Sequence, residues 1–143
     1  MRFLTLLVAL FALAGCQPKE IYVSDGYVRL AAVPGHPAVA YFTLHGGETD
    51  ATLISISSDV AIRTQMHESM QAGSVSSMKP LDHLALPAGS KIEFKPGGKH
   101  VMLFDVNPVI VPGRRTLPLL FTFADGLRIE YAATVIAAGD PAP

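Results

Sequence analysis

Short apolar segments separated by glycine- and proline-rich turns constrain the fold of this chain more than any other sequence feature. No stretch after the first sixteen residues keeps apolar side chains at the spacing that an amphipathic helix needs. Runs of four to eight apolar residues between turn signals are instead typical of β-strands. The pattern therefore predicts an all-β domain.

Eight segments have the length and composition of strands. In one of them, Ile54 and Ile56 alternate with Ser55 and Ser57, which predicts a strand with one buried face. The last two segments are joined by an Ala-Asp-Gly turn and should form a hairpin. The expected strands are residues 27–33, 38–44, 51–57, 59–66, 91–94, 101–106, 117–123 and 127–136. This many short strands with intervening turns predicts an antiparallel β-sandwich.

The first residues resemble the export signal of a bacterial lipoprotein. Arg2 supplies a positive charge, and about a dozen mostly apolar residues follow it. A membrane-spanning helix needs about 20 apolar residues, so this run is too short to be one. It ends in Leu-Ala-Gly-Cys, and Cys16, the only cysteine of the chain, stands where a lipid would be attached. The alternative is an ordinary secretory signal in which Cys16 is incidental.

The chain accordingly divides into four parts. We expect a lipoprotein signal peptide at 1–15, a tether at 16–23, a single domain at 24–137 and a flexible tail at 138–143. The domain would lie in the periplasm or cell envelope, held at a membrane through the lipid. With one cysteine, no disulfide can form within the chain, so burial of a core must stabilise the domain.

Composition excludes several classes of function. The formal net charge is -1 and no basic run is present, so we expect no nucleic-acid partner. No cysteine follows Cys16, which excludes thiolate catalysis, cysteine-rich zinc sites and a blue-copper centre. Gly97 and Gly98 are not followed by the Lys-Ser/Thr pair and helix of a phosphate-binding loop.

Methionine and histidine are concentrated in one part of the chain. Methionines that merely fill gaps in a core should be scattered along the strands. Instead, every methionine after the initiator lies between residues 66 and 102, together with three of the five histidines. These residues are Met66, Met70, Met78 and Met102, and His67, His83 and His100.

Four of these side chains can converge. His100 and Met102 are two residues apart, so on a strand both point to the same face. His67 and Met78 bracket a Gly- and Ser-rich segment, residues 70–77, that can fold so that both reach one point. Two imidazoles and two neutral thioethers, with no carboxylate, suit Cu(I) better than calcium, magnesium or zinc. The sequence therefore predicts a Cu(I) site.

At these residues the sequence resembles the periplasmic copper chaperone family PCu(A)C. The family motif is His, ten residues, Met, twenty-one residues, His, any residue, Met. His67, Met78, His100 and Met102 match all four positions and all three spacings. The flanking segments agree as well, and the resemblance covers roughly residues 24–136.

The resemblance implies a cupredoxin-like β-sandwich with Greek-key connections that binds one Cu(I) per chain. It also implies delivery of copper to a cuproprotein, typically the binuclear CuA site in subunit II of cytochrome c oxidase. A second copper chaperone is a further candidate partner, and we expect a monomer. Some members carry a His- and Met-rich C-terminal extension, which this chain lacks after Gly139, so a second copper site is not expected.

The sequence leaves the roles of the other methionines and histidines open. Met70, three residues after His67, is close enough in sequence to approach the metal, whereas Met66 should point away unless a bulge intervenes. The remaining histidines lie in or beside expected turns and are interpreted as solvated. They are His36, His45 and His83.

Two other functions compete with a copper carrier. One is an enzyme, either a copper-dependent oxidase or a thiol oxidoreductase. The chain offers no nucleophile–base pair and no Cys-x-x-Cys motif, so we expect no enzymatic activity. The other is a lipoprotein whose sandwich binds no metal and only scaffolds other proteins.

Overall fold

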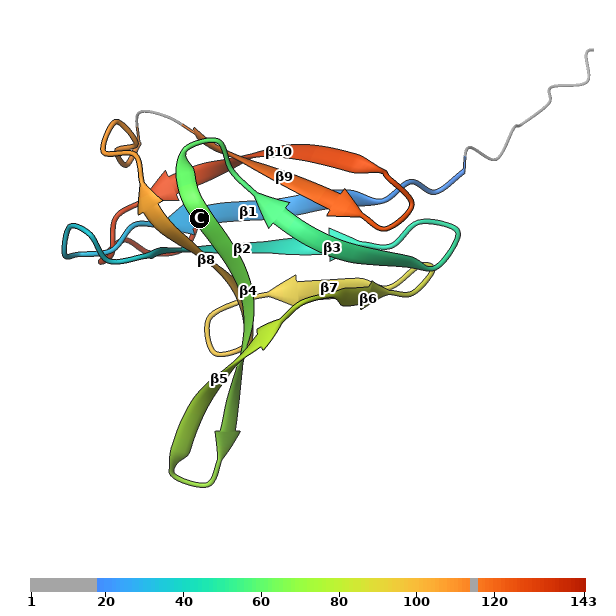
Figure 1. Cartoon of the computed structure of the whole chain (residues 1–143), viewed down its shortest axis with the longest axis horizontal. Helices are drawn as coiled ribbons and strands as arrows, with labels where there is room; N and C mark the ends of the chain where they lie inside the picture. Colours follow the sequence, from blue (N-terminus) through green and yellow to red (C-terminus); the bar gives the residue numbers. More distant parts are fainter. Residues whose placement is uncertain (1–17, 114–115) are drawn as a thin grey trace, which may run out of the picture.

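A computed structural model describes residues 18–113 and 116–143, and strands dominate it (Figure 1). The signal peptide and Cys16 lie outside the described residues. In order, the strands are β1 (Tyr22–Arg29), β2 (Ala38–His45), β3 (Ala51–Ser57), β4 (Ala61–Ala72), β5 (Val75–Leu81), β6 (Leu84–Leu86), β7 (Lys91–Phe94), β8 (Lys99–Val106), β9 (Thr116–Phe123) and β10 (Arg128–Ile136). Within the two described ranges, no helix is long and apolar enough to cross a membrane.

All the strands belong to one sheet with the order β5-β4-β8-β7-β2-β1-β10-β9-β3-β6, and β8 also pairs with β2. The pairings are antiparallel, as expected, except that β1 pairs with β10 and β7 pairs with β8 in parallel. The parallel contact of β1 with β10 forms because the sheet brings the first and last strands together while each keeps its antiparallel hairpin partner.

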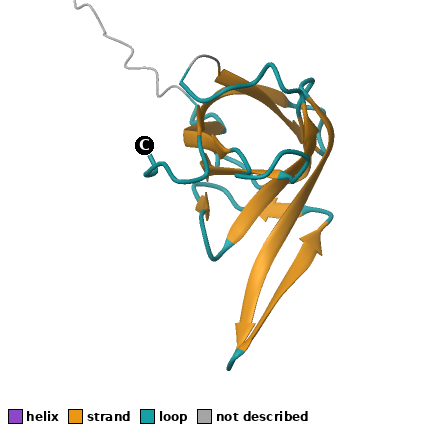
Figure 2. Ribbon diagram, turned by 90° about the vertical axis from the view of Figure 1, so that its left-hand side faces the viewer, coloured by secondary structure: helices purple, strands orange, loops and turns teal. Residues whose placement is uncertain are grey.

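The sheet curls around a single core, which gives the sandwich shape seen end-on in Figure 2. Strands β4 and β3 are far apart in the strand order, but the curl of the sheet brings them into contact. There the Thr64 hydroxyl donates a hydrogen bond to the Ile56 carbonyl. In the core, the Phe42 ring of β2 stacks on Phe94 at 4.3 Å and meets the edge of Phe121 at 4.9 Å. The Phe42–Phe94 contact lies between neighbouring strands, whereas the Phe42–Phe121 contact joins β2 to β9, which do not pair with each other.

Both ends of the domain extend beyond the expected boundaries. Strand β1 begins at Tyr22, and Ile21 already packs against the core, so ordered structure starts before residue 24. At the other end, Arg29 Nη1 donates hydrogen bonds to the carbonyls of Ala138 and Asp140. The first part of the expected tail is therefore attached to β1, because an arginine can satisfy several carbonyls at once.

Strand β3 departs from simple alternation. The register with β9 shifts between Leu53 and Ser55, which marks a β-bulge. Because the bulge adds one residue, Leu53 and Ile56 both face the core while Ile54 is exposed. The expectation that Ile54 and Ile56 share a face was therefore wrong.

Residues 70–77, which the sequence predicted to fold back on themselves, form a hairpin. Strand β4 continues to Ala72, the chain turns at Gly73 with a φ of 60°, and β5 runs back alongside it. The hairpin projects from the sandwich (Figure 1). Because both faces of its tip are exposed, its sequence lacks the apolar alternation that reveals a half-buried strand.

The aromatic contacts across the core predict that Phe42 is essential to stability. We expect Phe42→Ala to lower the free energy of unfolding by about 3–5 kcal/mol, since it removes a buried ring and leaves a cavity. The matched control is Ile62→Ala, at a side chain that is 83% exposed, with an expected change of about 0.5 kcal/mol or less. Urea unfolding measures both, and similar losses in the two variants would contradict this description of the core.

Candidate metal centre

The four candidate donors lie on three neighbouring strands. His67 is on β4, Met78 on β5, and His100 and Met102 on β8, with β4 between the other two. In the antiparallel pairing of β4 with β8, His67 lies directly opposite His100. Strands separated by twenty or more residues in sequence are thus brought side by side.

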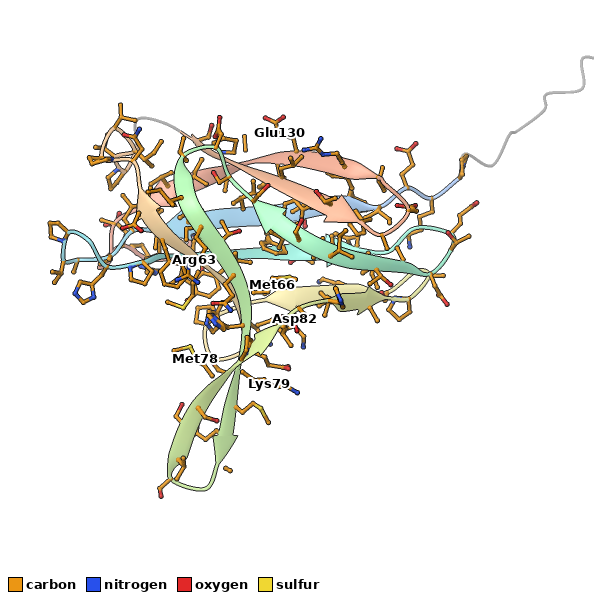
Figure 3. All side chains as sticks on the ribbon, viewed as in Figure 1. Arg63, Met66, Met78, Lys79, Asp82 and Glu130 are labelled. Atoms are coloured by element: carbon orange, nitrogen blue, oxygen red, sulfur yellow. The ribbon has the colours of Figure 1, made fainter. Side chains whose placement is uncertain are left out.

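Strand register places all four donors on one face of the sheet. Met102 lies opposite Gln65, and Met78 lies opposite Ser69. Gln65 and Ser69 are each two residues from His67, so they share its face, and directly opposed residues share a face as well. Figure 3 shows Met78 and its neighbour Lys79 on opposite sides of β5, as this register requires.

The two histidines differ in which ring nitrogen is available to bind a metal. Their ring centroids are 5.7 Å apart. His100 Nδ1 lies 3.0 Å from the Gly98 carbonyl oxygen, which can only accept, so this nitrogen carries the proton and Nε2 keeps its lone pair. His67 Nδ1 is buried and has no hydrogen-bond partner among the described residues. A buried nitrogen without a partner is costly, and a metal ion bound there would satisfy it.

Burial and neighbouring cations keep His67 uncharged. Burial lowers the pKa of His67 below its ordinary value, and His100 and Arg63 lower it further. His67 is therefore neutral at pH 7, which leaves one ring nitrogen with a lone pair for a metal. On the other face, Glu68 pairs with Lys99 at 2.8 Å. In the described residues, no three His, Cys, Asp or Glu side chains converge on one point, so a metal here depends on the thioethers.

Exposure varies strongly among the four donors. His100 is only 7% exposed, His67 and Met102 are intermediate, and Met78 is 60% exposed. The site therefore has a buried floor on β8 and an open side at the projecting hairpin. Such an arrangement can bind an ion and still let another molecule's ligands reach it.

The other methionines take different positions. Met66 is 5% exposed and lies in the core opposite Val101, as expected for a residue next to His67 on a strand. Met70 is three residues from His67, and the unbroken register turns it to the opposite face. The structure thus brings neither of them to the four donors.

The remaining histidines lie apart from the four donors. His36 and His83 are exposed, as expected. His45 is partly buried instead, because its ring stacks on Tyr22 at 4.1 Å and its Nε2 lies 2.9 Å from Ser24 Oγ.

Gln65, Arg63 and Phe104 also lie on the face of the donors, although their positions in the sequence did not mark them as part of a site. Gln65 lies beside Met102, while Arg63 lies opposite Phe104 with its guanidinium carbon 3.7 Å from the ring centroid. Residues 63 and 65 lie four and two positions before His67. Because side chains alternate between the faces of a strand, this spacing alone indicates that they face the same way as His67.

Comparison with known proteins gives a family and a fold. Residues 21–135 match the sequence profile of the LpqE-like family, described as "Putative lipoprotein LpqE-like". Among curated proteins, "Putative lipoprotein Lxx21020" from Leifsonia xyli subsp. xyli is 27% identical over 122 residues, which span 85% of this chain and 72% of that protein.

Solved structures of PCuAC domains share the fold. The copper-bound PCuAC domain from PmoF2 superposes with a TM-score of 0.67 at 20% identity, over 85% of this chain and 96% of that domain. The solution structure of CuI-DR1885 from Deinococcus radiodurans gives a TM-score of 0.67 at 23% identity, over 85% of this chain and 82% of that one. The expected cupredoxin-like β-fold is therefore confirmed.

The different positions of the methionines predict different effects on stability. In the metal-free protein, we expect Met66→Ala to lower the free energy of unfolding by about 2–5 kcal/mol, because it empties part of the core. Met78→Ala should change it by about 0.5 kcal/mol or less, because that side chain lies on the exposed hairpin. Denaturant titration of both variants tests this, and a large loss in Met78→Ala would contradict the described hairpin.

Proposed function

The chain belongs to the LpqE-like family, and from this premise we propose that it is a Cu(I) carrier of the cell envelope that delivers copper to a cuproprotein. One observation carries the proposal above all others. Four neutral, soft or borderline donors share one face of three adjacent strands, and one of them, His67 Nδ1, is buried without a hydrogen-bond partner in the part of the chain that the structure describes. The copper-bound PCuAC domain of the same fold supports it.

We assign the ligands as His67, Met78, His100 and Met102, with one Cu(I) per chain. His100 would bind through Nε2, because its Nδ1 is turned to the Gly98 carbonyl. His67 would bind through Nδ1, which is buried with no hydrogen-bond partner among the described residues. Thioether sulfur is soft and uncharged, which favours Cu(I) over zinc and over hard cations. A monovalent ion also needs little compensating charge, in keeping with the absence of carboxylates from this face of β4, β5 and β8.

The chemistry is that of a carrier, and no catalytic turnover is proposed. The exposed Met78 gives an incoming protein access to the ion, so its ligands can replace those of the carrier one at a time. The recipient is a cuproprotein. The motif shared with the PCu(A)C family favours the CuA site of cytochrome c oxidase as that recipient.

Attachment through Cys16 completes the proposal. A lipid on that residue would hold the domain at a membrane surface, since β1 begins only six residues later. The matching family and the Leifsonia relative are both described as lipoproteins, which supports this assignment.

Copper binding can be tested with a matched pair of methionine variants. We expect anaerobic Cu(I) titration against a competing chelator to saturate at one equivalent. Met78→Ala combined with Met102→Ala should weaken binding by more than about 100-fold, since even groups that only orient ligands contribute about 10–100-fold. Met70→Ala is the control, because Met70 lies on the same hairpin, is 51% exposed and faces the other way.

X-ray absorption of the Cu(I) form should resolve two sulfur and two nitrogen neighbours. Loss of one sulfur in Met78→Ala alone would identify that ligand directly. Unchanged affinity in the double variant, or equal weakening in Met70→Ala, would refute the ligand assignment.

The lipid anchor predicts where the protein is found in cells. Wild-type protein should sediment with membranes and carry the mass of a diacylglyceryl group on Cys16. Cys16→Ser should abolish that mass increase, because serine offers no thiol to the lipid transferase. Recovery of unmodified wild-type protein in the soluble fraction would argue for an ordinary secretory signal.

A further inference from the structure

The face that carries the four donors continues towards the start of β4. Three opposed pairs follow one another along β4 and β8 on this face, namely His67 with His100, Gln65 with Met102, and Arg63 with Phe104. Residues two apart on a strand are separated by about 7 Å. Arg63 therefore lies about 7 Å from the row of Met102 and about twice that from the row of the histidines.

The Arg63 guanidinium is held in place. Its central carbon lies 3.7 Å from the Phe104 ring centroid, a cation–π contact that fixes the plane of the group. Nη1 donates a hydrogen bond to Gln65 Oε1 at 3.3 Å. Arginine has five N–H donors in a rigid fork, so most of them remain available outside these contacts.

Arg63 has no acidic partner among the described residues, whereas three lysines do. Lys91 and Lys95 both pair with Glu93, and Lys99 pairs with Glu68. No ion pair involves Arg63 anywhere in residues 18–113 and 116–143. Its side chain is exposed, so an external anion can reach it.

Charge on this face is also one-sided. In the pairings of β4 with β5 and β8, the charged residues Glu68, Lys79 and Lys99 all face the other way. Among the paired residues of these strands, Arg63 is thus the only charged side chain on the donor face. An exposed arginine with no acidic partner among the described residues, fixed beside neutral donors, is complementary to one negative charge on a docking molecule.

We propose that Arg63 docks a carboxylate of the protein that receives copper, and so orients that protein's metal ligands over Met78 and Met102. The inference rests on the proposed Cu(I) carriage. A carboxylate fits because the guanidinium fork binds it through two parallel hydrogen bonds, which fixes direction as well as position. Given the spacing of residues along β4, the bound carboxylate would lie about 7–14 Å from the recipient's copper ligands.

Two chelators that differ only in charge provide the test. Bicinchoninate carries two carboxylates on a biquinoline core, and uncharged biquinoline has the same pair of donor nitrogens. The full-length protein is loaded with one equivalent of Cu(I), and the rate of transfer to each chelator is followed by absorbance at low salt. The compared proteins are wild type, Arg63→Gln, Arg63→Lys and Lys79→Gln.

Arg63→Gln should slow transfer to bicinchoninate by about 3- to 10-fold, because a charge at the edge of a contact acts mainly on the association rate. Transfer to biquinoline should not change. Arg63→Lys should restore part of the rate, since it keeps the charge but not the fork. Lys79→Gln removes the same charge from the opposite face and should change neither rate appreciably.

The outcomes separate this inference from the proposed function. If the wild type takes up no Cu(I), both fail together. If it loads one equivalent but Arg63→Gln slows both chelators equally, or no more than Lys79→Gln does, the carrier function stands and Arg63 is not a docking residue.

Discussion

The antiparallel pairing of β4 with β8 is the constraint on which the candidate site depends. Its register is continuous from the pair Arg63 and Phe104 to the pair Glu68 and Lys99. Because side chains alternate between faces, a slip of one residue would move every donor on β4 to the wrong side. Met66 and Val101, buried on the core side of this ladder, resist such a slip. Core packing on one face therefore positions the donors on the other.

The donors differ in how firmly the fold holds them. His100 is almost buried, and its ring is fixed by the Gly98 carbonyl. Met78 stands on a hairpin that has left the core, where few contacts restrain it. A site with a rigid floor and an adaptable thioether suits an ion that must be both bound and given up. Flexible, unbranched methionine is well matched to this role.

Charge is distributed between the two faces of the same strands. On the face opposite the donors, Glu68 pairs with Lys99, whereas Arg63 is the only charged side chain among the paired residues of the donor face. A hard divalent ion would find no anionic ligand there, but a soft monovalent ion needs none. The same separation leaves Arg63 free to interact with another molecule. Selection of the ion and recognition of its recipient would thus follow from one arrangement of side chains.

The sequence by itself determined the all-β class, the boundaries of β3 and β7, and the grouping of His67, Met78, His100 and Met102. These follow from local properties, namely the two-residue period of strands, turn residues and donor chemistry. Only the tertiary structure decided that residues 70–77 form a hairpin and that a bulge exposes Ile54. It also decided that Met70 faces away from the donors and that His67 Nδ1 has no hydrogen-bond partner within residues 18–113 and 116–143. These features depend on which distant strand lies alongside and in what register, and neither is encoded in the local period of a single segment.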